Sequence, residues 1–394
     1  TLLLSDSLSG ALSLASQSIL VVSGSGPLAS SVDLAGGSLR FLEDLEVKGP
    51  VSLSSDSVLE VGQNRTLRQT HSGGLLLGAY GLTLVGGGRF ESSGAIRLND
   101  SQSRLVLSGI TLDNVSTTSV SQGVSVDNAS GIETLSVLHR TPLSIEQDAT
   151  LAGHIELAGG GILELTGPGE VLSTLGFSGG VLRAEESMSW TGSWSQSDNA
   201  SVEILEGETL SYGDGDLQLG IHAMEIKGAG DLQIIDNQSA LVLDHPQSLL
   251  DLSGTGRAGR VRIQASPSSG RGLQISGQPT LGSLELLVDT SLSVANQFSV
   301  DEGILVDGVT LILEDDGTFA SSMELDNGTL VVTGEPVLSG QLSQSGASSI
   351  RLLEGALLTT NQSVGLGSSV LSLEGPGTRS EEHTSELQSH SDLV

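Results

Sequence analysis

Short alternations of apolar and polar residues, each closed by glycine, recur along the whole chain. The clearest copy is LELTGPG at 163–169. An alternation of period two predicts a strand with side chains on opposite faces, and the glycine permits a turn with positive φ at little cost. Related copies are LVVSGSG (20–26), LTLVGGG (82–88), MEIKGAG (224–230), LDLSGTG (250–256) and LSLEGPG (371–377), and looser copies are LEVKGPV (45–51), LVLSGIT (105–111), LQISGQP (273–279) and LVVTGEP (330–336).

The spacing of these strands predicts the architecture. Most gaps between the closing glycines are near one, two or three times a unit of about 20 residues. A unit that short holds two or three strands with tight corners, and it buries its apolar face only by stacking on its neighbours. The closing glycines lie at 24, 49, 86, 109, 167, 228, 254, 277, 334 and 375.

We therefore predict an all-β, single-stranded parallel β-helix with coils of about 20 residues. It should be right-handed, because crossovers between parallel strands almost always are. About 19 coils at about 4.8 Å each would give a rod about 90 Å long. An array of β-sandwiches or an antiparallel β-protein is the alternative, although the hairpin dipeptide Asn-Gly occurs only at 327–328.

Composition changes this picture only in detail. Aromatic residues make up 2% of the 394 residues, so the interior should consist of aliphatic side chains. Cysteine is absent, which excludes disulfides and thiolate metal sites. No apolar run reaches 18 residues, so the sequence predicts no membrane-spanning helix. Without a Pro-rich linker or charge block, residues 1–378 should form one continuous solenoid.

The net charge of −31 argues against two classes of partner. It repels nucleic acid and anionic membranes, and it keeps a long rod soluble. It is compatible with divalent cations or with a saline exterior.

The last 16 residues, 379–394, break the repeat abruptly. RSEEHTSELQSHSDLV resembles the in-frame translation of a widely used sequencing-library adapter. The resemblance implies a non-native tail, which would leave 1–378 as a solenoid fragment without its natural C-terminus. Because the chain does not begin with Met or a signal peptide, we expect its start to be truncated as well.

Eight of the nine asparagines stand in the pattern Asn-x-Ser/Thr, which has two interpretations. The pattern accepts N-linked glycans on exported proteins. It also fits a repeated turn, because Asn tolerates the left-handed region and hydrogen-bonds to its own turn, and Asp precedes it five times. The eight are Asn64, Asn99, Asn114, Asn128, Asn199, Asn237, Asn327 and Asn361.

Two acidic loops are weak candidates for a calcium site. Asp214 and Asp216 belong to GDGD, which is faintly similar to a calcium-binding glycine-aspartate repeat. Glu314, Asp315 and Asp316 could supply three carboxylates. We favour an ordinary turn for the first loop and a solvated hairpin-like corner for the second, so no cofactor is expected.

Further candidates concern glycans. Trp190 and Trp194 are four residues apart, so one extended strand would place them on one face, where exposed rings could stack on sugars; they could equally cap a coil. The basic residues Arg257, Arg260, Arg262 and Arg271 could dock an acidic glycan or neutralise acidic coils. GTGRAG at 254–259 matches a dinucleotide fingerprint, but a strand pattern follows it where that chemistry needs a helix.

The repeated motifs, with GGSLRFL at 36–42 and GTLVVTG at 328–334, resemble the passenger domains of bacterial autotransporters and related filamentous adhesins. The resemblance implies an outer-membrane-associated, cell-surface or extracellular β-helix without catalytic activity. It also implies partners among surface glycans or proteins of host and neighbouring cells. The alternative is a carbohydrate-active β-helix enzyme, a polysaccharide lyase or glycoside hydrolase, although the hydrolase motifs Asn-Thr-Asp and Gly-His-Gly are missing.

Overall fold

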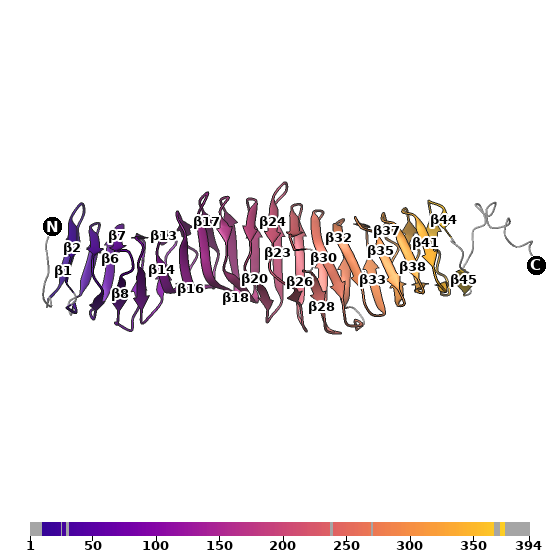
Figure 1. The fold of residues 1–394 in the computed structure, drawn as a ribbon, viewed down its shortest axis with the longest axis horizontal. Coiled ribbons are helices and arrows are strands. Elements are labelled where there is room, and N and C mark those ends of the chain that lie inside the picture. Colours follow the sequence, from indigo (N-terminus) through magenta and orange to yellow (C-terminus); the bar gives the residue numbers. More distant parts are fainter. Residues whose placement is uncertain are drawn as a thin grey trace, which may run out of the picture.

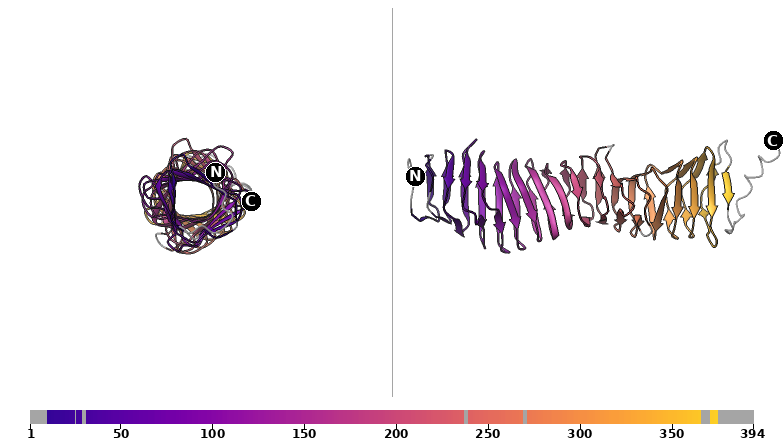
Figure 2. Two further views of the ribbon diagram at one scale, coloured as in Figure 1. Left: turned by 90° about the vertical axis from the view of Figure 1, so that its left-hand side faces the viewer. Right: turned by 90° about the horizontal axis from the view of Figure 1, so that it is seen from below.

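A computed structural model describes residues 10–24, 26–28, 31–236, 239–268, 271–365 and 371–374. In this part the chain forms strands β1 to β45 and no helix. The strands stack in parallel into a solenoid of about 17 turns, with coils about 20 residues apart (Figure 1). Seen along its long axis, the chain winds around one central core (Figure 2). The predicted all-β parallel solenoid is therefore confirmed, whereas the coil count of about 19 was slightly too high.

Each coil presents up to three faces, which we number in chain order. The first face is an unbroken ladder in which each strand pairs in parallel with the equivalent strand of the next coil. Its strands are β2 (Ile19–Val22), β4 (Ser38–Phe41), β7 (Ser57–Val61), β10 (Gly81–Val85), β13 (Arg104–Ser108), β15 (Gly123–Val126), β17 (Thr141–Ile145), β18 (Thr150–Thr166), β20 (Thr174–Ala184), β23 (Ala200–Ile204), β26 (Ala223–Gly228), β29 (Leu249–Leu252), β31 (Gly272–Ile275), β33 (Thr290–Val294), β36 (Thr310–Leu313), β39 (Thr329–Val332), β42 (Ser348–Leu352) and β45 (Leu371–Glu374).

The second face follows the first along the chain. The long strands β18, β30 and β32 cross a corner and contribute to it with one part of their length. Its other strands are β5 (Leu45–Val47), β8 (Thr66–Gln69), β11 (Arg89–Ser92), β14 (Thr111–Thr117), β16 (Ser130–Val137), β19 (Glu170–Val171), β21 (Met188–Trp190), β24 (Thr209–Tyr212), β27 (Asp231–Ile234), β34 (Gln297–Val300), β37 (Thr318–Phe319), β40 (Val337–Leu338) and β43 (Thr359–Thr360).

The third face leads back to the first. It also receives parts of β14, β16, β18 and β20. Its other strands are β1 (Leu12–Ala15), β3 (Val32–Ala35), β6 (Val51–Ser55), β9 (Leu75–Leu76), β12 (Ile96–Leu98), β22 (Trp194–Gln196), β25 (Leu217–Gln218), β28 (Leu241–Leu243), β30 (Arg257–Ile263), β32 (Thr280–Leu286), β35 (Ile304–Asp307), β38 (Met323–Asp326), β41 (Leu342–Ser345) and β44 (Val364–Gly365).

The core consists of aliphatic columns that run along the rod. Every second strand residue points inward and lies on the equivalent residue of the next coil, so stacking coils removes these side chains from water. The expected aliphatic interior is confirmed, and the buried side chains form one continuous cluster. One such column on the first face consists of Leu82, Leu105, Val124, Leu143 and Leu165.

The closing glycines serve two different purposes. Gly86, Gly167 and Gly228 have φ of 117°, 87° and 96°, as the turn prediction requires. Gly254 and Gly277 do not have positive φ. They are needed for close approach instead, because a Cβ on Gly277 would lie 2.0 Å from the carbonyl oxygen of Gly254.

No segment of the described chain forms a helix with the length and apolarity that a membrane span requires.

Candidate functional site

A groove of about 340 Å³ lies at the corner between the second and third faces. It extends across the coils of β27, β30, β32 and β34. We call it the corner groove. Its charged lining residues are Asp231, Asp236, Arg257, Arg260, Asp301 and Glu302.

Two glycines explain why the surface is hollow here. Gly259 and Gly282 lie within β30 and β32, so both strands pass the corner without a projecting loop. A Cβ on Gly259 would lie 2.5 Å from the side chain of Ile234, so the backbone of β30 packs directly against that residue. The next coil instead turns through 301–303, whose exposed residues Asp301 and Glu302 form a wall of the groove.

The arginines of this region do not form a single basic patch. Arg257 pairs with the carboxylate of Asp301, and its backbone N–H donates to Asp231 Oδ1 at 2.8 Å. Arg260 donates from Nε to Ser283 Oγ at 3.1 Å. The pairing of Arg257 with Asp301 fits the neutralising role, whereas Arg260 bonds to an uncharged hydroxyl.

Arg262 lies on the third face, beyond the groove. It contacts Asp216 Oδ2 from Nη1 at 3.0 Å and Glu285 Oε2 from Nε at 2.6 Å. Hydrogen bonding to Glu285 raises the pKa of Arg262, so this cation is permanent. Arg271 is exposed on another coil.

The weak calcium candidates lie apart from one another and are already used. Asp216 accepts a hydrogen bond from the backbone N–H of Ala240 at 2.9 Å besides its pair with Arg262. Asp316 accepts from the backbone N–H of Glu335 at 2.7 Å.

The other members of these loops add no ligand set. Asp315 accepts from the hydroxyl of Ser293, and the backbone carbonyl of Asp214 accepts from Tyr212 Oη. Within the described ranges, no three carboxylate or imidazole groups gather in a way that could hold a metal ion, and this includes Glu314. The carboxylates of Asp216, Asp315 and Asp316 therefore brace adjacent coils.

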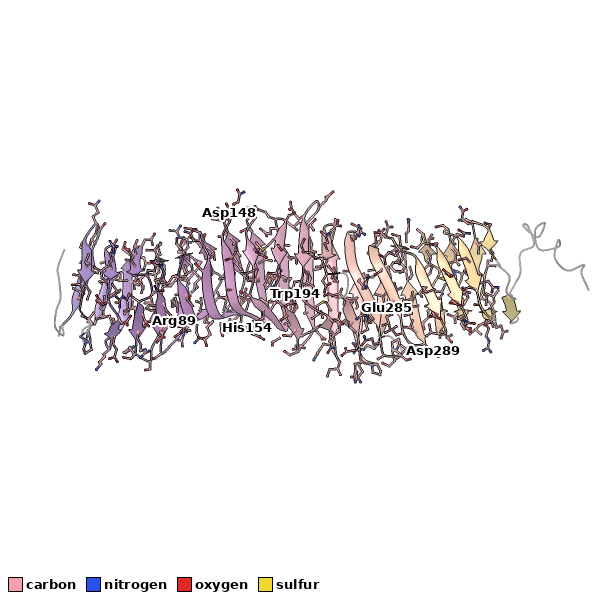
Figure 3. All side chains as sticks on the ribbon, viewed as in Figure 1. Arg89, Asp148, His154, Trp194, Glu285 and Asp289 are labelled. Carbon is pink, nitrogen blue, oxygen red and sulfur yellow. The ribbon has the colours of Figure 1, made fainter. Side chains whose placement is uncertain are left out.

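The prediction that Trp190 and Trp194 offer exposed rings to a sugar is wrong. Their exposures are 0% and 4%, because both rings point into the core. The chain bends at Gly192 between β21 and β22, so the two residues lie on different faces rather than along one extended strand. Trp194 lies near the middle of the rod (Figure 3).

Seven sequon asparagines fall in the described ranges, and all seven are exposed at or beside corners. Asn64 and Asn327 have φ of 57° and 52°, which is the left-handed conformation expected of an Asn turn. The Oδ1 atoms of Asn99, Asn199 and Asn327 accept backbone N–H bonds from adjacent coils at 2.9, 2.8 and 3.0 Å. Asn64 and Asn327 thus have the conformation of the turn interpretation, whereas Asn99 and Asn199 join adjacent coils.

The remaining sequons are less constrained. Asn128 donates from Nδ2 to Ser108 Oγ at 2.8 Å, while Asn114 and Asn361 are exposed. Asn237 lies outside the described residues, as do residues 379–394. Glycosylation stays a prediction.

A polar cluster on the third face was missed by the sequence analysis. His154 Nδ1 is 2.8 Å from Thr174 Oγ1, and His154 Nε2 is 3.1 Å from Glu156 Oε2 (Figure 3). Ser178 donates to the same carboxylate. The signal was present as His-x-Glu, since residues two apart on a strand share a face.

A hydroxyl, an imidazole and a carboxylate are also the groups of a catalytic triad, and here Thr174, His154 and Glu156 make the corresponding contacts. The side chains of the cluster come from β18 and β20, which are neighbouring strands of the parallel ladder. We assign the cluster a structural role in joining adjacent coils.

A ladder of alternating charges crosses the middle of the rod. Glu164 is 2% exposed and accepts from Arg140 Nε at 2.7 Å and from Arg183 Nη1 at 2.9 Å. Arg183 also binds Glu203 at 2.9 Å. The acidic residues of successive coils are therefore compensated locally wherever an arginine is available.

No family model, curated protein sequence or solved structure matches this chain. A proposal for its function therefore rests on the contacts between residues within this chain.

Proposed function

We propose that this chain is an exported or cell-surface β-solenoid that acts as a non-catalytic, adhesin-like scaffold. The observation that carries the proposal is the unbroken first-face ladder over about 17 turns, which covers one continuous core. Such a rod holds its surface at a fixed spacing and extends it over a long distance. Length and rigidity are the properties that a display arm needs.

The outer surface supports the same proposal. Some of its acidic side chains pair with arginines of neighbouring coils, as Glu164 does, and others accept backbone N–H groups, as Asp316 does. Groups engaged in this way brace the rod. The remaining net negative charge keeps an exposed rod soluble in saline surroundings. We propose glycans or proteins on other cells as its partners, and a core that folds without metal.

A carbohydrate-active enzyme is the less favoured alternative. Glycoside hydrolysis requires two carboxylates that flank one glycosidic bond. Three of the four carboxylates in the corner groove are engaged, because Asp231 accepts the N–H of Arg257, Asp301 pairs with the Arg257 guanidinium and Asp236 accepts from Ser239 Oγ. We therefore favour binding over chemistry at this groove.

Labelling of intact cells tests the proposal. Antibodies raised against the purified chain should label unpermeabilised cells of the source organism, and the purified chain should compete with those cells for attachment. Labelling that requires permeabilisation would show an internal protein and would sink the proposal. A deletion strain supplies the control for antibody specificity.

The proposed adapter origin of 379–394 needs a separate test. Resequencing the source locus with long reads should show a different sequence after the codon of Thr378. If the same sixteen codons are present in the genome, the tail is native.

A further inference from the structure

We infer that the corner groove binds an uncharged oligosaccharide. This inference rests on the proposed function, since it specifies the class of partner that the scaffold would hold. It depends on three features of the groove: its size, the presence of both carboxylates and guanidinium groups in its lining, and the fixed position of its arginines.

The groove has the dimensions of a small-ligand site. Its volume of about 340 Å³ lies within the range of roughly 300–1,000 Å³ that small-molecule sites occupy. Its floor is made by β27, β30 and β32, which are held in the rod by neighbouring coils. A site on strands keeps its shape when a ligand binds.

The lining charges exclude most other classes of small ligand. Four carboxylates and two guanidinium groups line the groove, and the whole chain is strongly acidic, so an anion is repelled. A metal ion finds no three ligating groups gathered within the described residues, and an organic cation would have to lie against Arg257 and Arg260 on the floor strand. An apolar ligand would strip water from charged groups without replacing their hydrogen bonds. An uncharged molecule covered with hydroxyl groups avoids all three costs.

The arrangement of donors and acceptors suits hydroxyl groups. A hydroxyl both donates and accepts, so it can bridge a carboxylate and a guanidinium. Arg257 is held by Asp301 and Arg260 by Ser283, which positions both arginines before a ligand arrives. Glu302 is exposed on the groove wall and can accept from a further hydroxyl.

The test is calorimetric titration of the full chain with four neutral trisaccharides: cellotriose, maltotriose, mannotriose and N-acetylchitotriose. Trigalacturonate is the anionic comparison. Arg260→Met should weaken binding about tenfold or more, because it removes charged donors but keeps the stem of the side chain. Gly282→Leu, which adds a side chain to the floor, should abolish binding. Arg351→Met is the matched control on the distant strand β42 and should bind as the wild type does.

Binding of at least one neutral trisaccharide, with these losses and an unchanged control, supports the inference. It is overturned if none of the four binds at millimolar concentration, if both groove variants bind normally, or if trigalacturonate binds most tightly. Circular dichroism shows whether each variant is folded. If antibodies label intact cells but no sugar binds, the proposed function stands and only the sugar-binding inference is wrong. If a sugar binds but labelling requires permeabilised cells, the sugar-binding inference stands and only the proposed function is wrong.

Discussion

Trp194 contacts three other aromatic rings inside a core that is mostly aliphatic. Its ring centroid lies 5.7 Å from Phe177, 5.9 Å from Trp190 and 4.6 Å from Tyr212. The four residues come from β20, β21, β22 and β24, so they fill the interior of successive coils. Their burial could not be deduced from spacing, because the bend at Gly192 changes the face to which the second tryptophan belongs.

Because of Tyr212, the stability of this region should change with pH in the alkaline range. Burial raises the pKa of Tyr212 from 10.0 to about 12. Below pH 10 the hydroxyl is protonated in both states. Between pH 10 and about 12 the unfolded chain loses this proton first, so the free energy of unfolding falls as pH rises.

We therefore expect the denaturation midpoint followed by tryptophan fluorescence to decrease over this pH interval. Tyr212→Phe should lose this part of the decrease, although it also removes the hydrogen bond to the Asp214 carbonyl and costs about 1 kcal/mol at neutral pH. Tyr80 is the only other tyrosine, so Tyr80→Phe is the matched control and should behave as the wild type does. Parallel pH profiles for the wild type and Tyr212→Phe would contradict the assignment.

The groove shows what single residues could and could not indicate. Arg257 and Arg260 were identified in the sequence because they form its densest basic segment. Asp231 and Asp301 were not, because they are far from those arginines in sequence and approach them only through coil lengths that vary from one turn to the next. Residues that pair between adjacent coils can be identified only when the register of the paired strands is known.

Strands and corners can be predicted from the sequence far better than the residues that meet in the corner groove. The alternation of LELTGPG becomes the end of β18, where Leu163 and Leu165 are fully buried and Thr166 is not. Period two alone requires this result, since successive side chains of a strand point to opposite faces. The alternative of antiparallel strands is excluded by the parallel register of the paired strands.

The corners are predicted in position but only partly in mechanism. Glycine at 254 and 277 indicated a turn with positive φ, whereas these glycines lack positive φ and are required by contact with the coil before them. Nothing in one strand reveals how closely the next will approach. The number of coils was overestimated for a similar reason, because corner lengths vary.

Substitution of Gly277 measures this close approach. Gly277→Ala should destabilise its coils by about 1–3 kcal/mol, because the added methyl would lie 2.0 Å from the Gly254 carbonyl oxygen and force the coils apart. Gly213→Ala is the matched control, since its nearest contact would be at 3.7 Å, and it should change stability by less than about 0.5 kcal/mol. Urea denaturation monitored by circular dichroism gives both values. Equal effects at the two positions would show that contact with the preceding coil is unimportant.

At the scale of the whole molecule, stability comes from contacts between neighbours. Each coil touches mainly the coil before and the coil after it, so the rod behaves as a one-dimensional array. Coils that bury fewer large side chains should open before the others. The inner coils around Trp194 also contain the aromatic cluster, which adds burial that aliphatic coils lack.

These facts predict that unfolding of the rod is not two-state. Trp190 and Trp194 are the only tryptophans, and their ring centroids are 5.9 Å apart. Trp194 lies near the middle of the rod (Figure 3), so fluorescence reports the central coils. Far-ultraviolet circular dichroism reports all strands. As urea increases, the circular dichroism signal should decline first and the fluorescence transition should follow at a higher concentration. Trp194→Phe should bring the two transitions closer together, because it weakens the centre while leaving the ends unchanged. Coincident transitions in the wild type would show that all coils unfold together, and the independent-neighbour description would then be wrong.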